Sequence, residues 1–180
     1  MRTACKDIEE LVGVVWVSGT PSLQVPYLIN LALLLTTVIP AMPPSPRSLF
    51  RLIGKMDHAF SSLILGRDID TGERLPGFEG RKGVSGTEKV RIRSLVERTR
   101  VSVMEAFKKG EFELEPEDKD EDKMETDDEG ELVLEGDNFE DAEEEDSWDM
   151  QLARVYDHTV VELGDSLEEP SIGIITERRG

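Results

Sequence analysis

Cysteine and histidine are scarce in this chain, which has one cysteine, Cys5, and two histidines, His58 and His158. A single cysteine cannot form an internal disulfide, and this favours a reducing compartment, the nucleus or the cytoplasm, over secretion. A structural zinc site takes about four ligands, mostly cysteine and histidine. We therefore predict no metal site and no other cofactor.

Charge is missing from a long stretch near the N-terminus, where residues 11–46 contain no Asp, Glu, Lys or Arg. The most apolar run, residues 27–39, lies between Pro26 and Pro40. A membrane-spanning helix needs about 20 apolar residues, more than this run provides. We interpret it as a buried core helix. A small membrane-associated protein, attached through residues 11–46, is a second alternative.

Apolar spacing predicts helices through the first 110 residues. Residues 5–17 fit a helix, although their branched side chains also suit a strand. The next helix should begin near Pro26 and, being apolar on nearly every side, should be central in the bundle. Ser45 and Pro46 begin a third helix that ends at Gly66. Its apolar stripe consists of Leu49, Leu52, Ile53, Met56, Phe60, Leu63 and Ile64, and Arg47, Arg51, Lys55 and Asp57 lie off it.

A glycine-rich loop over residues 68–86 precedes the fourth helix. Ser85 and Glu88 have the spacing of a capping box, and Gly110 ends the helix. Its predicted buried face holds Ile92, Leu95, Val96, Thr99, Val103, Ala106 and Phe107.

Negative charge is concentrated in residues 111–146, which contain 21 Asp or Glu and two Lys, a net charge of −19 in a chain of −18. Such a segment cannot bury enough apolar surface to offset its chain entropy, so we predict a disordered linker. Residues 147–165 then form an amphipathic helix that can pack back on the core or bind elsewhere, and residues 166–180 form a flexible tail. The predicted fold is mainly α, a small bundle of four to five helices with a helical core over residues 1–110, interrupted by the long acidic segment.

We find no catalytic constellation. The pairs Asp57–His58 and Asp157–His158 are of a kind that any chain of this length contains by chance. The loop over residues 77–87 lacks the residue order of a phosphate-binding loop. We therefore predict that the chain is not an enzyme.

The separation of charge is the main functional clue. Residues 81–109 carry nine basic and three acidic residues, a net charge of +6, next to the acidic segment. We predict a non-catalytic adaptor or complex-assembly subunit that binds protein partners, some of them basic. Nucleic acid is disfavoured because the attached polyanion would compete with phosphate. The candidate partner-binding residues are Trp148, Leu152, Val155, Tyr156, Arg91, Arg93, Arg98 and Arg100.

The alternative function is an acidic chaperone or nuclear regulator of a basic protein, of the histone or ribosomal type. In a further interpretation the acidic segment screens the basic helix until a partner displaces it. Thr126 and Ser166 precede acidic residues and are candidate phosphorylation sites. The partner, the pathway and the oligomeric state stay open at this stage.

Overall fold

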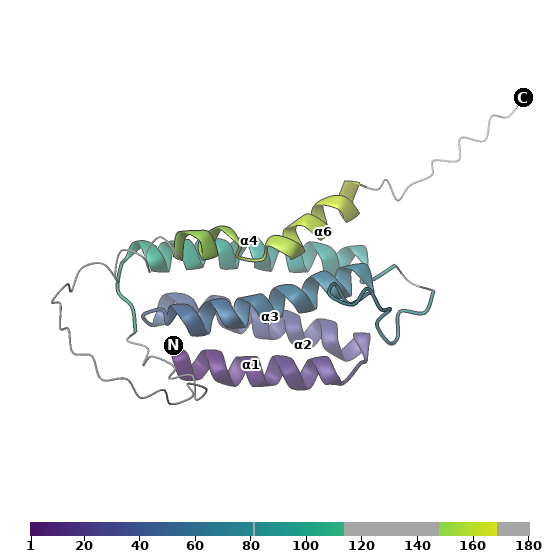
Figure 1. Ribbon diagram of the computed structural model, residues 1–180, viewed down its shortest axis with the longest axis horizontal. Helices are drawn as coiled ribbons and strands as arrows, with labels where there is room; N and C mark the ends of the chain where they lie inside the picture. Colours follow the sequence, from purple (N-terminus) through teal and green to yellow (C-terminus); the bar gives the residue numbers. More distant parts are fainter. Residues whose placement is uncertain (81, 114–147, 169–180) are drawn as a thin grey trace, which may run out of the picture.

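The structure, a computed structural model, describes residues 1–80, 82–113 and 148–168 (Figure 1). Its helices are α1 (Arg2–Val17), α2 (Pro21–Val38), the short 3-10 helix η1 (Ile39–Ala41), α3 (Pro46–Leu65), α4 (Gly86–Lys108) and α6 (Asp157–Glu168). Residues 148–153 are also helical. The long helices run side by side, with α2 and α4 behind α1 and α3 in the view of Figure 1. The predicted mainly α bundle is confirmed, and the described part of the chain contains no β-strand.

The first two helices decide between helix and strand for residues 5–17 and correct the predicted start of the second helix. Residues 5–17 are helical, within α1, and not a strand. The second helix begins at Pro21 and not at Pro26, because the Thr20 carbonyl accepts the N–H groups of Leu23 and Gln24 and so starts the helix earlier. Pro26 lies on the exposed side of its second turn.

The central helix is α3, and the prediction that residues 27–39 occupy the centre is wrong. All seven residues of the predicted stripe of α3 are buried, and so are small residues on its other sides, including Ala59, Ser61 and Ser62. Small side chains let neighbouring helices approach closely, which explains why α3 is enclosed. In contrast, α2 buries one side only and leaves Leu23, Tyr27, Leu33 and Leu34 about half exposed.

The predicted ends of α3 and the start of α4 are confirmed. Ser45 and Pro46 begin α3, and Gly66 ends it in the left-handed region at φ 68°. At the start of α4, the Ser85 hydroxyl accepts the Glu88 N–H at 3.3 Å while the Glu88 carboxylate accepts the Ser85 N–H at 2.8 Å.

The loop between α3 and α4 packs on the bundle. Phe78 is buried, and the Val84 N–H donates to the Leu63 carbonyl at 3.1 Å. Gly83 has φ 120°, and a Cβ atom there would lie 1.9 Å from the carbonyl oxygen of Ile64. Only glycine fits this approach of the two backbones.

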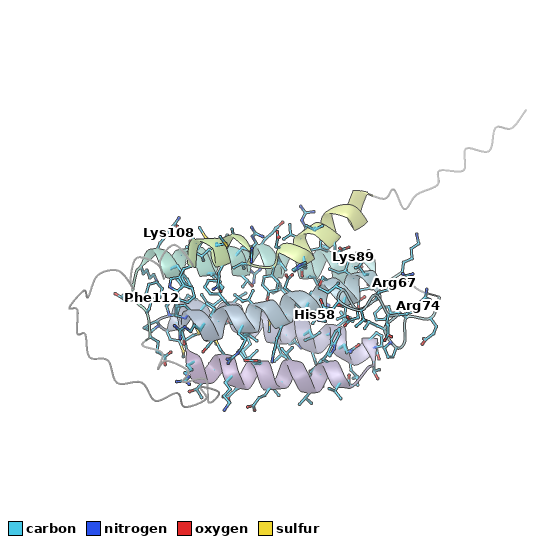
Figure 2. The ribbon with its side chains drawn as sticks, in the orientation of Figure 1. His58, Arg67, Arg74, Lys89, Lys108 and Phe112 are labelled. Carbon is cyan, nitrogen blue, oxygen red and sulfur yellow. The ribbon has the colours of Figure 1, made fainter. Side chains whose placement is uncertain are left out.

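The first residues after α4 also pack on the bundle, which corrects the predicted start of the disordered linker at residue 111. The Glu113 N–H donates to the Pro44 carbonyl at 2.8 Å, and the Glu113 carboxylate accepts the Arg2 N–H at 3.0 Å. Figure 2 places Phe112 at the same end of the bundle as Lys108. The rest of the predicted linker, the predicted tail beyond residue 168, and Thr126 lie outside the described residues.

Candidate interaction site

The C-terminal element, defined as residues 148–168, packs against α3 and α4 by way of α6. We expected one helix over residues 147–165, but a turn at residues 154–156 interrupts it. Within this turn Tyr156 has φ 56°, an uncommon conformation for an aromatic residue. The break turns the Tyr156 ring into the core, so burial of a large side chain offsets the backbone cost.

Tyr156 is enclosed by side chains of α3. Its ring centroid lies 6.3 Å from that of Phe60, and its hydroxyl donates to the Met56 sulfur at 3.3 Å. Burial, together with the nearby Asp57 carboxylate, raises the pKa of the Tyr156 hydroxyl well above its ordinary value. The neutral phenol is therefore part of the packed state.

Asp57, which the sequence pattern placed off the buried face of α3, is 4% exposed and caps α6 from outside that helix. One carboxylate oxygen accepts the Thr159 N–H at 2.8 Å and the Thr159 hydroxyl at 2.6 Å. The other accepts the His158 N–H at 3.2 Å and lies 2.9 Å from His158 Nδ1.

The first N–H groups of a helix lack partners inside it, and a Ser, Thr, Asp or Asn just before the helix usually supplies one. Here Tyr156 holds that position, and the carboxylate of Asp57 takes over the role. A negative charge is also favoured at a helix N-terminus by the helix dipole. Asp57 is therefore a latch that holds the C-terminal element on α3.

Arg100 of α4 holds the same turn from the other side. Its guanidinium donates to the Val155 carbonyl at 3.0 Å. The cation from α4 thus binds the turn at residues 154–156, and the carboxylate from α3 binds the first turn of α6 that follows it.

A row of aromatic rings joins the residues that flank the segment 114–147. Trp148 stacks on Phe50 with ring centroids 5.8 Å apart, and Phe50 lies 5.2 Å from Phe107. Phe107 in turn lies 5.2 Å from Phe112. Phe112 and Trp148, on either side of residues 114–147, therefore lie at the same end of the bundle.

The structure places the predicted partner-binding residues in three different settings. Val155 and Tyr156 are buried, and Trp148 and Leu152 are half-buried, so these four face the bundle. Arg91, Arg93 and Arg98 are exposed on α4, and Arg93 pairs with Glu97 at 3.0 Å. Arg100 contacts the C-terminal turn, and Ser166 lies in α6.

A cavity of ≈730 Å³ lies between α3 and the C-terminal element. It brings together the two Asp–His pairs that the sequence analysis treated separately, with His58 and His158 both on its wall. Within the described residues no serine, threonine or cysteine lines this cavity. The usual nucleophiles that a histidine activates are therefore missing from its described wall.

His58 also belongs to a group of possible metal ligands with Asp68 and Asp70. Its Nε2 lies 3.1 Å from an Asp70 carboxylate oxygen and 3.5 Å from one of Asp68. The pKa of Asp68 lies below its usual value, mainly because its carboxylate accepts a hydrogen bond from the Thr71 N–H. The ligand atoms lie within 4.8 Å of one another, a spacing that could hold a cation. Counting cysteines and histidines could not find this group because two of its members are aspartates.

Comparison with known proteins identifies a family. The family model described as TFB6, subunit 11 of the general transcription factor TFIIH, matches residues 1–164. No curated protein and no solved structure matches the chain. The matched range includes the bundle, the acidic segment and most of the C-terminal element.

Proposed function

Because the chain belongs to the TFB6 family of TFIIH subunits, we propose that it is a non-catalytic subunit of that complex and acts by binding partner proteins. A general transcription factor works on nuclear genes, so we expect the chain in the nucleus rather than the cytoplasm. Within the complex we assign it an adaptor role, in which its helical body contacts other subunits.

The hydrogen bonds that Asp57 accepts are the main support for the non-catalytic assignment. Both oxygens of this buried carboxylate accept hydrogen bonds from His158 and Thr159. A catalytic aspartate next to a histidine would orient that histidine toward a reacting group. Asp57 does contact His158 Nδ1, but the same carboxylate also binds two backbone N–H groups of α6, and no serine, threonine or cysteine of the described residues lines the cavity beside His158. These contacts support a structural role for Asp57.

Co-purification tests the proposal. The full chain, tagged and expressed in place of the native copy, should be recovered with the other TFIIH subunits in a fixed ratio by native mass spectrometry. Complex prepared without the chain should lose a subunit contact, detected by cross-linking, if the chain is an adaptor. Recovery of the chain free of every other TFIIH subunit would refute the proposal.

A second candidate function, regulation of a basic protein, is favoured by the charge and the attachment of the acidic segment. Residues 114–147 contain 19 Asp or Glu and two Lys, a net charge of −17. Phe112 and Trp148, on either side of the segment, belong to one row of aromatic rings. The residues that flank the segment are thus attached at one end of the bundle, and we propose that the charge of the segment steers a basic partner toward the chain.

Two replacements of residues 114–147 test this second function. One is a glycine–serine linker of equal length, and the other changes every Asp and Glu to Asn or Gln. Both should keep the melting temperature of the helical body and lose salt-dependent binding to a basic partner, with histone used as the probe. Histone binding equal to wild type at every salt concentration would reject the function.

A further inference from the structure

The outward side of α2 is apolar and carries no charge. Leu23, Tyr27 and Leu34 share one face of the helix, with positions four and eleven residues apart, and are 48%, 56% and 47% exposed. Asn30 and Thr37 complete this stripe, and Leu33 borders it. We call these six residues the α2 face. It lies opposite Val25, Leu28, Ala32 and Leu35, which the bundle buries.

A helix on the surface of a soluble protein usually directs charged residues outward. The neighbouring α4 follows this rule, with Arg91, Arg93 and Arg98 exposed. Burying a leucine side chain removes on the order of 100 Å² of apolar surface from water, so a half-exposed leucine presents roughly 50 Å². A half-exposed tyrosine presents a larger area. The α2 face is thus on the order of a few hundred Å², the size of patch that is often functional on monomers.

The chemistry of this face defines what can cover it. A charged group of a partner placed on the α2 face would lose its water without meeting an opposite charge on that face, because residues 11–46 contain none. The partner surface must therefore be uncharged and apolar. Tyr27 can serve as the central anchor, since half-exposed aromatics give large contact area at low entropic cost.

We propose that the α2 face binds another subunit of TFIIH, through an uncharged apolar helix or groove of that subunit. This inference rests on the proposed function, which supplies a protein partner. Among the described helices, Pro21–Ala41 is long and apolar enough to cross a membrane, so lipid is the competing cover. A subunit of a transcription complex meets proteins rather than lipid, and that decides between them.

A pair of matched double variants tests the inference. Leu23→Lys with Leu34→Lys places two charges on the α2 face, eleven residues apart. Val90→Lys with Val101→Lys places two charges at the same spacing on α4, where these valines are 58% and 57% exposed. The α2 variant should lower recovery with TFIIH about tenfold or more, the effect of about 1.4 kcal/mol of lost binding energy, and the α4 variant should not.

Circular dichroism of both variants checks folding, and Tyr27→Ser repeats the test without adding charge if the lysine variant does not fold. Wild-type recovery of the lysine or serine variant would overturn the inference while leaving the proposed function intact. Failure of the wild-type chain to co-purify would overturn both.

Two further outcomes would also overturn it. One is a dimer of the isolated chain, seen by light scattering, that dissociates in the α2 variant while TFIIH recovery is unchanged. The other is flotation of the wild-type chain with neutral phosphatidylcholine vesicles, lost in the α2 variant, again with unchanged TFIIH recovery.

Discussion

Asp57→Ala removes the carboxylate that caps α6, and we expect it to release the C-terminal element from the bundle. The buried N–H of Thr159 then has no acceptor, while its hydroxyl keeps the Asp57 backbone carbonyl at 3.2 Å. A buried donor left without a partner costs about 1–3 kcal/mol, and bonds to a charged group are worth more than neutral ones. We expect a total loss of about 2–4 kcal/mol.

Amide hydrogen exchange measures this loss where it occurs. A cost of about 2–4 kcal/mol corresponds to roughly 30- to 700-fold faster exchange for residues 159–163, if they exchange by local opening. The amides of α1 should change much less. Asp57→Asn keeps one acceptor oxygen for Thr159 and should give an intermediate effect.

Asp7→Ala, an exposed position on α1, is the control for loss of a carboxylate. The reasoning would be refuted if Asp57→Ala and Asp7→Ala gave the same exchange rates in α6. It would also be refuted if Asp57→Asn were as damaging as Asp57→Ala, because the acceptor and not the charge is assigned most of the effect.

Three further predictions concern the loop and two titrating groups. Gly83→Ala places a Cβ atom against the Ile64 carbonyl and should lower the free energy of unfolding, measured in urea, by more than about 3 kcal/mol. Gly72 has φ 71° but open space around it, so Gly72→Ala should lower this free energy by only about 1–2 kcal/mol. Equal losses in the two variants would contradict the prediction. Burial alone would raise the pKa of Glu9, but its hydrogen-bonded ion pairs with Lys55 and Arg51 of α3 hold that pKa below the ordinary 4.5. The stability that Glu9 contributes is therefore present above pH 4.5 and is lost as the pH falls through its folded pKa. Thermal melting from about pH 5 to pH 3 should therefore fall less steeply for Glu9→Gln than for wild type, and parallel curves would count against the ion pair. Because the pKa of Tyr156 is raised in the folded chain, this hydroxyl ionises first in the unfolded chain as the pH rises above the ordinary pKa of 10.0. Above about pH 10 the wild type should therefore lose more stability than Tyr156→Phe. An equal loss in the two proteins would argue against the burial of Tyr156.

Local signals predicted two helices well. The apolar stripe of α3 repeats over its whole length, and Pro46 and Gly66 mark its ends through their own backbone preferences. Ser85 and Glu88 bond to each other across one turn, so their spacing alone locates the start of α4. Interactions between residues a few positions apart can be predicted from the sequence because both partners lie in the same short segment.

The position of α2 in the bundle could not be read in the same way. A helix that is apolar on nearly all sides gives no periodic signal for the side that is buried, so its apolar content alone predicts full burial. The small residues of α3 make it the enclosed helix, which leaves one side of α2 outside. Apolar content thus predicted a helix and gave no information on its neighbours.

The candidate site depended on contacts between residues about 100 positions apart. Asp57 lies two residues after Lys55 and off the apolar stripe, as a surface residue would, yet it binds Thr159. The turn at residues 154–156 had no local signal either, because left-handed backbone is usually marked by glycine or asparagine and here the residue is Tyr156. Both features arise only when α3 and the C-terminal element meet.

The stacking of Trp148 on Phe50, which also contacts Phe107, has a consequence for the covalent chain. A protease cut anywhere in residues 114–147 would leave two fragments whose described contacts, the aromatic row, the Arg100 bond and the Asp57 latch, are all still available. The intact peptide then works as a tether that keeps the C-terminal fragment at high effective concentration beside the residues of α3 and α4 that it contacts. Separately expressed fragments should accordingly reassemble, with the stability of the pair set by their concentration.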